Sequence, residues 1–401
     1  MEGMTTTDSV NGPSIRPFRI AIPQTDVDEL AARVVATRLP RVLGDGSDET
    51  GFPTAAAHDL LVHWQQRFDW RRVEARLDEL DHVLVRDSGG QDLHVVRART
   101  GDPGRLPVVL LHGWPDSFLR YRHLLSPLTA AGHDVYVPSL PGFGFSDQPA
   151  GPATVETAAD AVGAALQALG VTRYAVHGGD WGSAVAEQLA RTRPDAVAAV
   201  HLTDVPWQHA FTVERSGLSP AENSFLDEAG SWAAQAAYLT VQSTQATTLA
   251  LALADSPMGL AAWVAEKYAT WSDQPLDHDE VLAQVCLTWF TRTEHSGMRY
   301  YSALGGSWDE ETTGDTGTTG DAAADGWVDS GGDGWEPEAI DQPVALAVFP
   351  ADILTPPREY AQRVFPTLTR FTAMPRGGHF AALEQPELLA TDIAAFLSGL
   401  R

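Results

Sequence analysis

The stretch Tyr174-Ala-Val-His-Gly-Gly-Asp180-Trp181-Gly182 decides the fold of this chain. A short apolar run that enters a glycine-rich turn and then a helical pattern is typical of a strand–turn–helix motif. In its usual form, G-x-S-x-G, this motif presents a nucleophilic serine, and here Asp180 stands in place of that serine. A carboxylate can displace a leaving group from sp³ carbon and form an ester. Asp180 is therefore a candidate nucleophile, and a cap for the following helix is the alternative role.

Short apolar runs alternate with helical patterns on both sides of this stretch. Runs that are apolar throughout fit strands buried on both faces of a sheet. Their alternation with helices predicts an α/β fold, a mainly parallel sheet flanked by helices with right-handed crossovers. The strand patterns cover residues 107–112, 134–138, 173–177, 197–203, 344–350 and 368–374, and the helical patterns cover residues 118–131, 155–169, 183–193 and 386–397.

Other segments add to this core, and their patterns predict six parts of the chain. A helical insertion late in a parallel sheet can supply a lid over the carboxyl ends of the strands. The N-terminal part should contain three helices (26–37, 55–68 and 70–79) and a hairpin of strands 82–87 and 92–99. The predicted parts are a disordered leader (1–15), an N-terminal meander (16–100), the first part of the core (101–204), a helical cap (205–308), an acidic, glycine-rich mobile insertion (309–338) and the second part of the core (339–401).

Charge and composition limit the partners of this protein. The 401 residues carry a formal net charge of −26, which argues against nucleic acid and anionic membrane as partners. No apolar run approaches the roughly 18–20 residues of a membrane span, and the N-terminus lacks the pattern of a signal peptide. The single cysteine, Cys286, excludes an internal disulfide and a cysteine-based zinc site. A cytoplasmic protein is the expectation that follows from this cysteine count. We also expect no metal site, since the Asp/Gly repeats at 315–321 lack the spacing of calcium loops.

Hydrolysis of an ester on Asp180 needs a base that activates water and an acid that orients this base. His379, in Arg376-Gly-Gly-His-Phe380, follows the last strand pattern. Asp352 follows the preceding strand pattern, 27 residues ahead of the histidine. The order nucleophile, acid, histidine is that of α/β-hydrolases. Glu384 is the poorer candidate for the acid because we expect it to lie within the last helix.

The developing oxyanion also needs hydrogen-bond donors. One backbone amide should come from the residue after the nucleophile, Trp181. The second should come from the loop after the early strand, where His112-Gly-Trp-Pro115 makes the amide of Trp114 the candidate.

Together these motifs resemble the microsomal-type epoxide hydrolases, which have the α/β-hydrolase fold. The resemblance runs from about residue 16 to the C-terminus, with the acidic insertion as an interruption. The motifs that carry it are Arg16-Pro-Phe-Arg19, Trp64-Gln-Gln-Arg-Phe-Asp-Trp70, Leu93-His-Val95, His112-Gly-Trp-Pro115, Pro141-Gly-Phe-Gly-Phe-Ser146, Gly178-Gly-Asp-Trp-Gly182, Val241-Gln-Ser-Thr-Gln245, Leu253 to Trp263 and Gly377-Gly-His379.

The resemblance implies a function for each site residue. Asp180 is implied as the nucleophile, His379 as the base that activates water, and Asp352 as its acidic partner. Two cap tyrosines, Tyr238 and Tyr301, are implied to bind the epoxide oxygen, and the adjacent Tyr300 could be confused with the second. The implied reaction takes a small-molecule epoxide and water to a vicinal diol and needs no cofactor.

Two other functions stay open on the sequence alone. A haloalkane dehalogenase would use the same nucleophile with halide-binding indole groups, and a catalytically silent protein could keep the fold as a receptor. The tryptophans and phenylalanines of the cap favour an aryl or bulky apolar epoxide. Relatives in bacterial natural-product pathways, enediyne antibiotics among them, suggest a biosynthetic setting, and a homodimer is compatible with the sequence. The membrane anchor of the microsomal members is absent from these residues.

Overall fold

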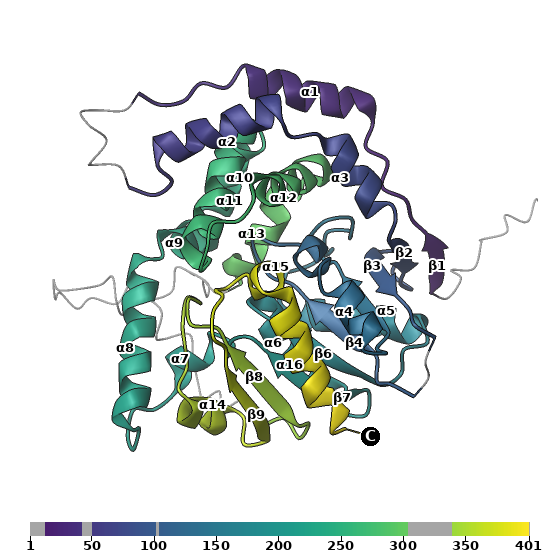
Figure 1. The fold of residues 1–401 in the computed structure, drawn as a ribbon, viewed down its shortest axis with the longest axis vertical. Coiled ribbons are helices and arrows are strands. Elements are labelled where there is room, and N and C mark those ends of the chain that lie inside the picture. Colours follow the sequence, from purple (N-terminus) through teal and green to yellow (C-terminus); the bar gives the residue numbers. More distant parts are fainter. Residues whose placement is uncertain (1–12, 42–49, 102–103, 304–338, 401) are drawn as a thin grey trace, which may run out of the picture.

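A nine-stranded sheet forms the centre of the described part of the chain (Figure 1). The computed structural model describes residues 13–41, 50–101, 104–303 and 339–400. The strands follow the order β1-β2-β3-β5-β4-β6-β7-β8-β9 across the sheet. Their bounds are β1 (Ser14–Pro17), β2 (Asp81–Arg86), β3 (Asp92–Ala98), β4 (Val108–Leu111), β5 (Val135–Pro138), β6 (Tyr174–Gly178), β7 (Val197–Leu202), β8 (Val344–Val348) and β9 (Leu368–Ala373).

Most of this sheet is parallel, as the apolar runs predict. Strands β5, β4, β6, β7, β8 and β9 run in one direction, while β1, β2 and β3 form antiparallel pairs that join the sheet through β5. All four residues of β4 are buried, because helices cover both faces of a parallel sheet. The predicted α/β fold is confirmed.

The helices fall into an N-terminal group, a core group and a cap group. In the core, α5 packs against α6 and α4 packs against α16. The helices are α1 (Gln24–Val35), α2 (Thr54–Gln66), α3 (Trp70–Leu77), the 3₁₀ helix η1 (Phe118–Tyr121), α4 (Leu125–Ala130), α5 (Val155–Ala168), α6 (Trp181–Thr192), α7 (His209–Thr212), α8 (Pro220–Gln235), α9 (Ala237–Thr244), α10 (Ala246–Leu253), α11 (Pro257–Trp271), α12 (His278–Thr291), α13 (Glu294–Ser302), α14 (Arg358–Val364), α15 (Ala381–Glu384) and α16 (Pro386–Ser398).

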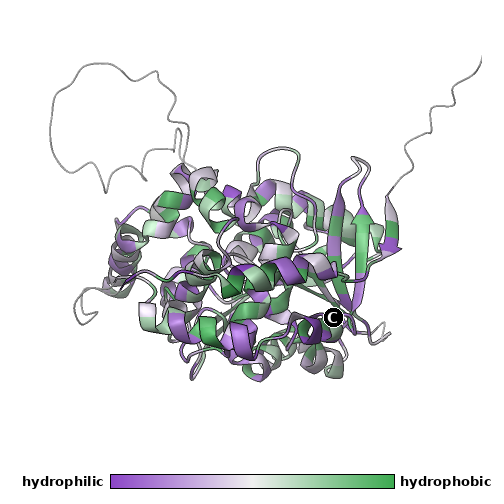
Figure 2. Ribbon diagram, turned by 90° about the horizontal axis from the view of Figure 1, so that it is seen from above, coloured by the Kyte–Doolittle hydropathy of each residue, from purple (hydrophilic) through white to green (hydrophobic). Residues whose placement is uncertain are grey.

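The cap helices α8–α13 lie between β7 and β8 in the sequence; α9–α13 stand over one end of the sheet, and α8 runs along its β8–β9 side (Figure 1). The N-terminal helices α1, α2 and α3 contact α11 or α12 on the side of the cap away from the sheet. Hydrophilic and hydrophobic residues are interspersed along these helices (Figure 2). The predicted acidic insertion, 309–338, and residues 304–308 of the predicted cap lie outside the described residues.

The structure corrects three details of the sequence reading. Strand β1 begins at Ser14, inside the predicted leader, because it pairs with β2; residues 1–12 lie outside the described part. The helix predicted over 118–131 is two elements, η1 and α4, because Pro127 has no N–H to continue a helix and sits in the first turn of a new one. Glu384 ends the short helix α15 and is not in the last helix, because Pro386 starts α16.

In the described part of the chain, no single helix is both long and apolar enough to cross a membrane. Helices α10 and α11 meet the criteria of length and composition only when taken together, and they are bent by 118° at the break between them.

Candidate active site

Asp180 lies at the sharp turn between β6 and α6. Its φ of 58° is in the left-handed region that residues other than glycine rarely adopt, so the backbone is strained at this position. Neighbouring glycines let the turn form: a Cβ on Gly178 would lie 2.1 Å from the carbonyl oxygen of Gly182, and one on Gly182 would lie 2.0 Å from that of Leu111. The turn therefore holds the Asp180 side chain above the carboxyl end of β6.

Two backbone amides hold one oxygen of the Asp180 carboxylate. The N–H of Trp114 donates to Oδ1 at 2.8 Å and the N–H of Trp181 donates to the same atom at 2.7 Å. Gly113 permits this approach, since a Cβ there would lie 2.0 Å from Oδ1. These are the two amides predicted as the oxyanion hole, and they leave Oδ2 as the oxygen able to attack. The same contact with Trp181 caps α6, the alternative role considered for Asp180, and it leaves the predicted nucleophilic role possible.

His379 lies between two carboxylates. Its Nδ1 is 2.8 Å from Oδ1 of Asp352, and its Nε2 is 3.6 Å from Oδ2 of Asp180. Burial lowers the pKa of His379, but the charge of Asp352 and hydrogen bonding to Asp180 and Asp352 outweigh burial and raise this pKa to about 10. This pKa keeps the imidazole protonated at neutral pH. The structure brings together the three side chains that the sequence predicts as nucleophile, base and acid.

The cap places Tyr238 (α9) and Tyr301 (α13) across from Asp180. Both are buried, and their ring centroids are 5.9 Å apart. The ring of Trp114 stacks on Tyr238 and meets Tyr301 edge to face. The hydroxyl of Tyr300 instead donates to the carbonyl oxygen of Pro141 at 3.0 Å, outside this site. Tyr301, and not Tyr300, therefore faces the nucleophile.

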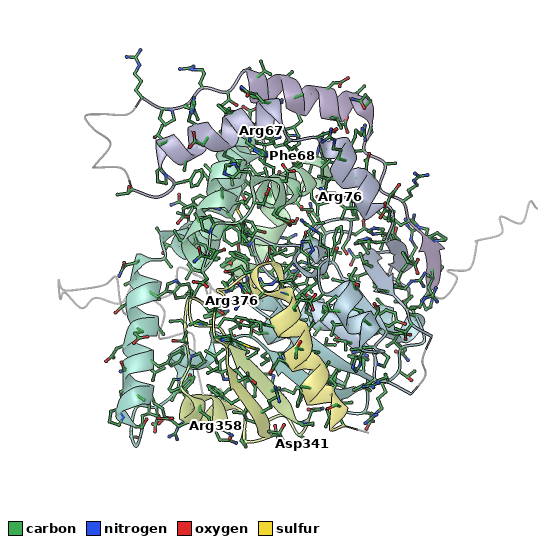
Figure 3. The ribbon with its side chains drawn as sticks, in the orientation of Figure 1. Arg67, Phe68, Arg76, Asp341, Arg358 and Arg376 are labelled. Carbon is green, nitrogen blue, oxygen red and sulfur yellow. The ribbon has the colours of Figure 1, made fainter. Side chains whose placement is uncertain are left out.

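These groups share one cavity of about 850 Å³, which includes space open to solvent. The cavity lies between the carboxyl ends of the strands and the cap. Figure 3 shows Arg376, in the loop that leads to His379, between β8 and β9 and the cap helices. The walls of the cavity are mainly apolar and aromatic. Its lining includes Asp180, Tyr238, Tyr301, Asp352, His379, Trp207, Phe225, Trp232, Leu239 and Leu354.

The chain is similar to known proteins over nearly its whole length. The family described as Epoxide hydrolase N terminus matches residues 15–121, and the alpha/beta hydrolase fold family matches residues 107–285. A protein of Stigmatella aurantiaca assigned as an epoxide hydrolase is 34% identical over 404 residues, which cover 96% of this chain and 86% of the relative. The chain belongs to the epoxide hydrolase family. Epoxide hydrolase 1 of Sus scrofa is 29% identical, over 96% of this chain and 89% of its own length.

Solved structures of epoxide hydrolases have the same fold as this epoxide hydrolase. An enantioselective mutant of the Aspergillus niger enzyme superposes with a TM-score of 0.80 at 27% identity, over 97% of each chain. The juvenile hormone epoxide hydrolase of Bombyx mori superposes with a TM-score of 0.76 at 24% identity, over 96% of this chain and 93% of its own length. The haloalkane dehalogenase and silent receptor that the sequence left open gain no support from these relatives.

Sequence reasoning missed a third carboxylate of this epoxide hydrolase site. Asp204 lines the cavity, and its Oδ2 accepts the N–H of Asp180 at 2.8 Å. Burial and then the charge of Asp352 raise the pKa of Asp204 to about 6. The signal that could have found Asp204 is its place directly after β7, the same kind of position that Asp180 and Asp352 occupy after their strands. Asp204 steadies the strained backbone of the nucleophile.

A buried charge network behind His379 was also missed. The guanidinium of Arg120, in η1, pairs with Asp116 at 2.7 Å and donates to the carbonyl oxygen of His379. The hydroxyl of Tyr268, in α11 of the cap, donates to the other oxygen of Asp116. The network joins core and cap at the loop that carries the histidine. Among the described residues, no three His, Cys, Asp or Glu side chains are grouped to hold a metal ion; the repeats at 315–321 lie outside them.

Proposed function

We propose that this epoxide hydrolase converts an aryl or bulky apolar epoxide to a vicinal diol through a covalent ester on Asp180. The observation that carries the proposal is that the two oxygens of the Asp180 carboxylate have different surroundings. Oδ1 of Asp180 is held by two amides, Oδ2 faces His379, and two phenols lie across the same cavity. Each part of a two-step displacement and hydrolysis has a matching group.

In the first step, Oδ2 of Asp180 attacks one epoxide carbon and the C–O bond of that carbon breaks. The epoxide oxygen takes the electron pair and needs a proton or strong hydrogen bonds. Burial, followed by the charge of Asp180, raises the pKa of Tyr238 well above its ordinary value, and burial with the neighbouring Tyr238 and Asp180 does the same for Tyr301. Both phenols stay protonated at neutral pH and can donate to the oxygen.

In the second step, water attacks the carbonyl carbon of the ester. Ester formation neutralises Asp180, so His379 loses one of the two anions that raise its pKa. The imidazole can then pass its proton to the phenol that gave one to the epoxide oxygen, and accept a proton from the attacking water, while Asp352 continues to orient it through Nδ1. The amides of Trp114 and Trp181 already point at the oxygen that becomes the oxyanion.

The walls of the cavity support the substrate class. Trp207, Phe225 and Trp232 offer aromatic surface, and Leu239 and Leu354 add aliphatic surface. Apolar walls with a few placed polar groups suit apolar small molecules. An aryl epoxide can lay its ring against these walls with its oxygen toward the two phenols.

Intact-protein mass spectra of a His379→Gln variant test this mechanism. The variant should form the ester with styrene oxide and fail to hydrolyse it, giving an adduct of the whole epoxide mass that maps to Asp180. A His379→Gln/Asp180→Asn double variant is the control and should give no adduct. An adduct with a bromoalkane alone would instead indicate a dehalogenase, and an adduct at another residue would contradict the role of Asp180.

The biological setting of the enzyme stays a prediction. The cytoplasm is the compartment we propose from the single cysteine. A role in natural-product biosynthesis rests on the resemblance of the sequence alone. The homodimer and the absence of nucleic acid partners are likewise predictions, which light scattering and binding assays can test.

A further inference from the structure

Lys267 is the only lysine in the sequence, and arginine supplies every other strongly basic side chain. It lies in α11 of the cap and is buried. Its Nζ is 4.5 Å from the centroid of the Tyr238 ring, and it also lies over the rings of Trp271 and Trp263 at 5.6 and 5.7 Å. Three aromatic faces thus surround one ammonium ion, a geometry in which a cation is attracted to the electron-rich faces of the rings.

The ring beneath this ammonium ion belongs to one of the two proposed proton donors. The charged groups that act on Tyr238 are Asp180 across the cavity and Glu266 beside Lys267, and both oppose negative charge on the phenol. Glu266 forms an ion pair with Lys267, and its side chain keeps 22% of its exposure. Lys267 is the cation in contact with the ring, so it is placed to offset these two anions.

We propose that Lys267 is an electrostatic positioning residue for epoxide opening: its ammonium ion over the ring of Tyr238 stabilises the negative charge that develops as this phenol donates to the epoxide oxygen. The inference rests on the proposed function, in which Tyr238 and Tyr301 are the donors. Because the ammonium ion lies over the ring of Tyr238 and not over that of Tyr301, the two phenols are not equivalent as donors. Tyr238 is then the donor that transfers its proton.

The proton balance of the cycle is closed. When Asp180 attacks, the C–O bond breaks, and the epoxide oxygen takes the electron pair and the phenolic proton of Tyr238. The phenolate that remains is paired with the ammonium ion of Lys267. His379 then passes its proton to this phenolate, and the one proton that hydrolysis of the ester yields, beside a carboxylate and an alcohol, restores the imidazolium of His379. Lys267 itself neither gains nor loses a proton.

The competing interpretation is that Lys267 only packs the cap and holds the ring of Tyr238 in place. The two roles differ when the hydroxyl is removed and the ring is kept. In a Tyr238→Phe variant the aromatic rings around Lys267 remain. If Lys267 only packs the cap, its replacement would therefore still slow ester formation in this variant. An effect on phenolate charge would vanish, because phenylalanine has no proton to donate.

A double-mutant cycle separates these roles. The rate of ester formation with styrene oxide is measured in single turnover by rapid quench and mass spectrometry, for Lys267→Met alone and in the Tyr238→Phe and Tyr301→Phe backgrounds. We expect Lys267→Met to slow ester formation about tenfold, the size of a desolvated cation–π contact expressed as a rate. We expect no further loss in Tyr238→Phe and at least the same loss in Tyr301→Phe, where Tyr238 is the remaining donor.

A rate for Lys267→Met equal to that of the wild type, or an equal loss in the Tyr238→Phe background, would overturn the inference and leave Lys267 a packing residue. These outcomes leave the proposed function intact. If Tyr238→Phe alone forms the ester at the wild-type rate, the proposed role of Tyr238 is wrong, and this is a failure of the proposed function itself.

Glu266→Gln provides a test that keeps Lys267 in place, should Lys267→Met fail to fold. This change removes an anion that opposes charge on Tyr238, at a partly exposed position. Ester formation should become a few-fold faster, and the gain should be absent in the Tyr238→Phe background. An unchanged or slower rate in Glu266→Gln would contradict the proposal.

Discussion

At the scale of single residues, His379 is controlled by the two carboxylates on either side of it. Asp352 is 2.8 Å from Nδ1 and Asp180 is 3.6 Å from Nε2. Burial alone would lower the pKa of the imidazole, and the two anions reverse this effect and raise the pKa to about 10. His379 therefore holds a proton at neutral pH, and in the proposed mechanism the formation of an ester on Asp180 lowers its pKa.

This pKa predicts how stability depends on pH. The folded-state pKa of His379 lies above the ordinary value of 6.5, so the folded protein binds the proton more tightly than the unfolded chain. The stabilisation is fully present below about pH 6.5 and is lost as the pH rises through about 10. We expect the difference in free energy of unfolding between wild type and His379→Gln to shrink steadily from pH 6.5 to pH 10.

Urea unfolding of both proteins across this range measures that difference, and subtracting the variant removes the contributions of other titrating groups. His123→Gln is the control, since the side chain of His123 is partly exposed, contacts Glu280 and has a pKa lowered by partial burial and then by Arg122. A difference between wild type and His379→Gln that stays constant or grows toward pH 10 would contradict the raised pKa.

At the scale of elements, the short segments that follow β6, β7, β8 and β9 carry Asp180, Asp204, Asp352 and His379. The last of these, between β9 and α15, is held by Glu384, whose carboxylate accepts the N–H groups of Gly378 and Phe380 at 3.1 Å and that of Asp273 at 2.7 Å. The N–H of His379 donates to the carbonyl oxygen of Trp271, in α11. The loop of the base is therefore fixed by both core and cap.

Glu384→Gln tests this support. An amide side chain has one acceptor oxygen in place of two, so it cannot satisfy all three N–H groups, and the loss should cost about 1–3 kcal/mol of stability. Because the loop carries the base and not the nucleophile, hydrolysis of the ester should slow more than its formation. The single-turnover rates of both steps measure this split. Glu387→Gln, at an exposed position of α16, is the control and should change neither of the two rates. An equal loss of both rates in Glu384→Gln would contradict the proposed role of Glu384 in holding the loop of His379.

At the scale of the whole molecule, the cap and the core share the catalytic groups. The core supplies the proposed nucleophile, base and acid, and the cap supplies both phenols and much of the apolar wall. The N-terminal helices pack against α11 and α12, so they support the cap from behind. Substrate choice should therefore depend on cap residues that never touch the reacting atoms.

Trp232, in α8, is such a residue, and its ring lies 6.5 Å from that of Tyr238. Trp232→Ala removes aromatic wall from the cavity, so it should lower the preference for styrene oxide over propylene oxide, measured as the ratio of kcat/KM, about tenfold. Trp289→Ala is a matched control, because Trp289 packs under Arg33 away from the cavity. An unchanged ratio in Trp232→Ala would show that the aryl group binds elsewhere.

The sequence by itself determined the α/β fold and the positions of Asp180, His379, Asp352 and the two amides, because each follows a buried parallel strand and such strands end at one edge of the sheet. It also placed the phenols in the cap, through a resemblance to a family, but did not separate Tyr300 from Tyr301. The roles at the site stay proposals until the variants are measured.

Only the tertiary structure decided which tyrosine faces the nucleophile and which groups surround the catalytic ones. Tyr300 and Tyr301 are neighbours in one helix, and the register of α13 against the core turns one hydroxyl to Pro141 and the other to the cavity. Lys267 reaches Tyr238 because α11 packs beside α9 in the folded cap. No local pattern encodes such contacts, since they depend on how separate helices pack.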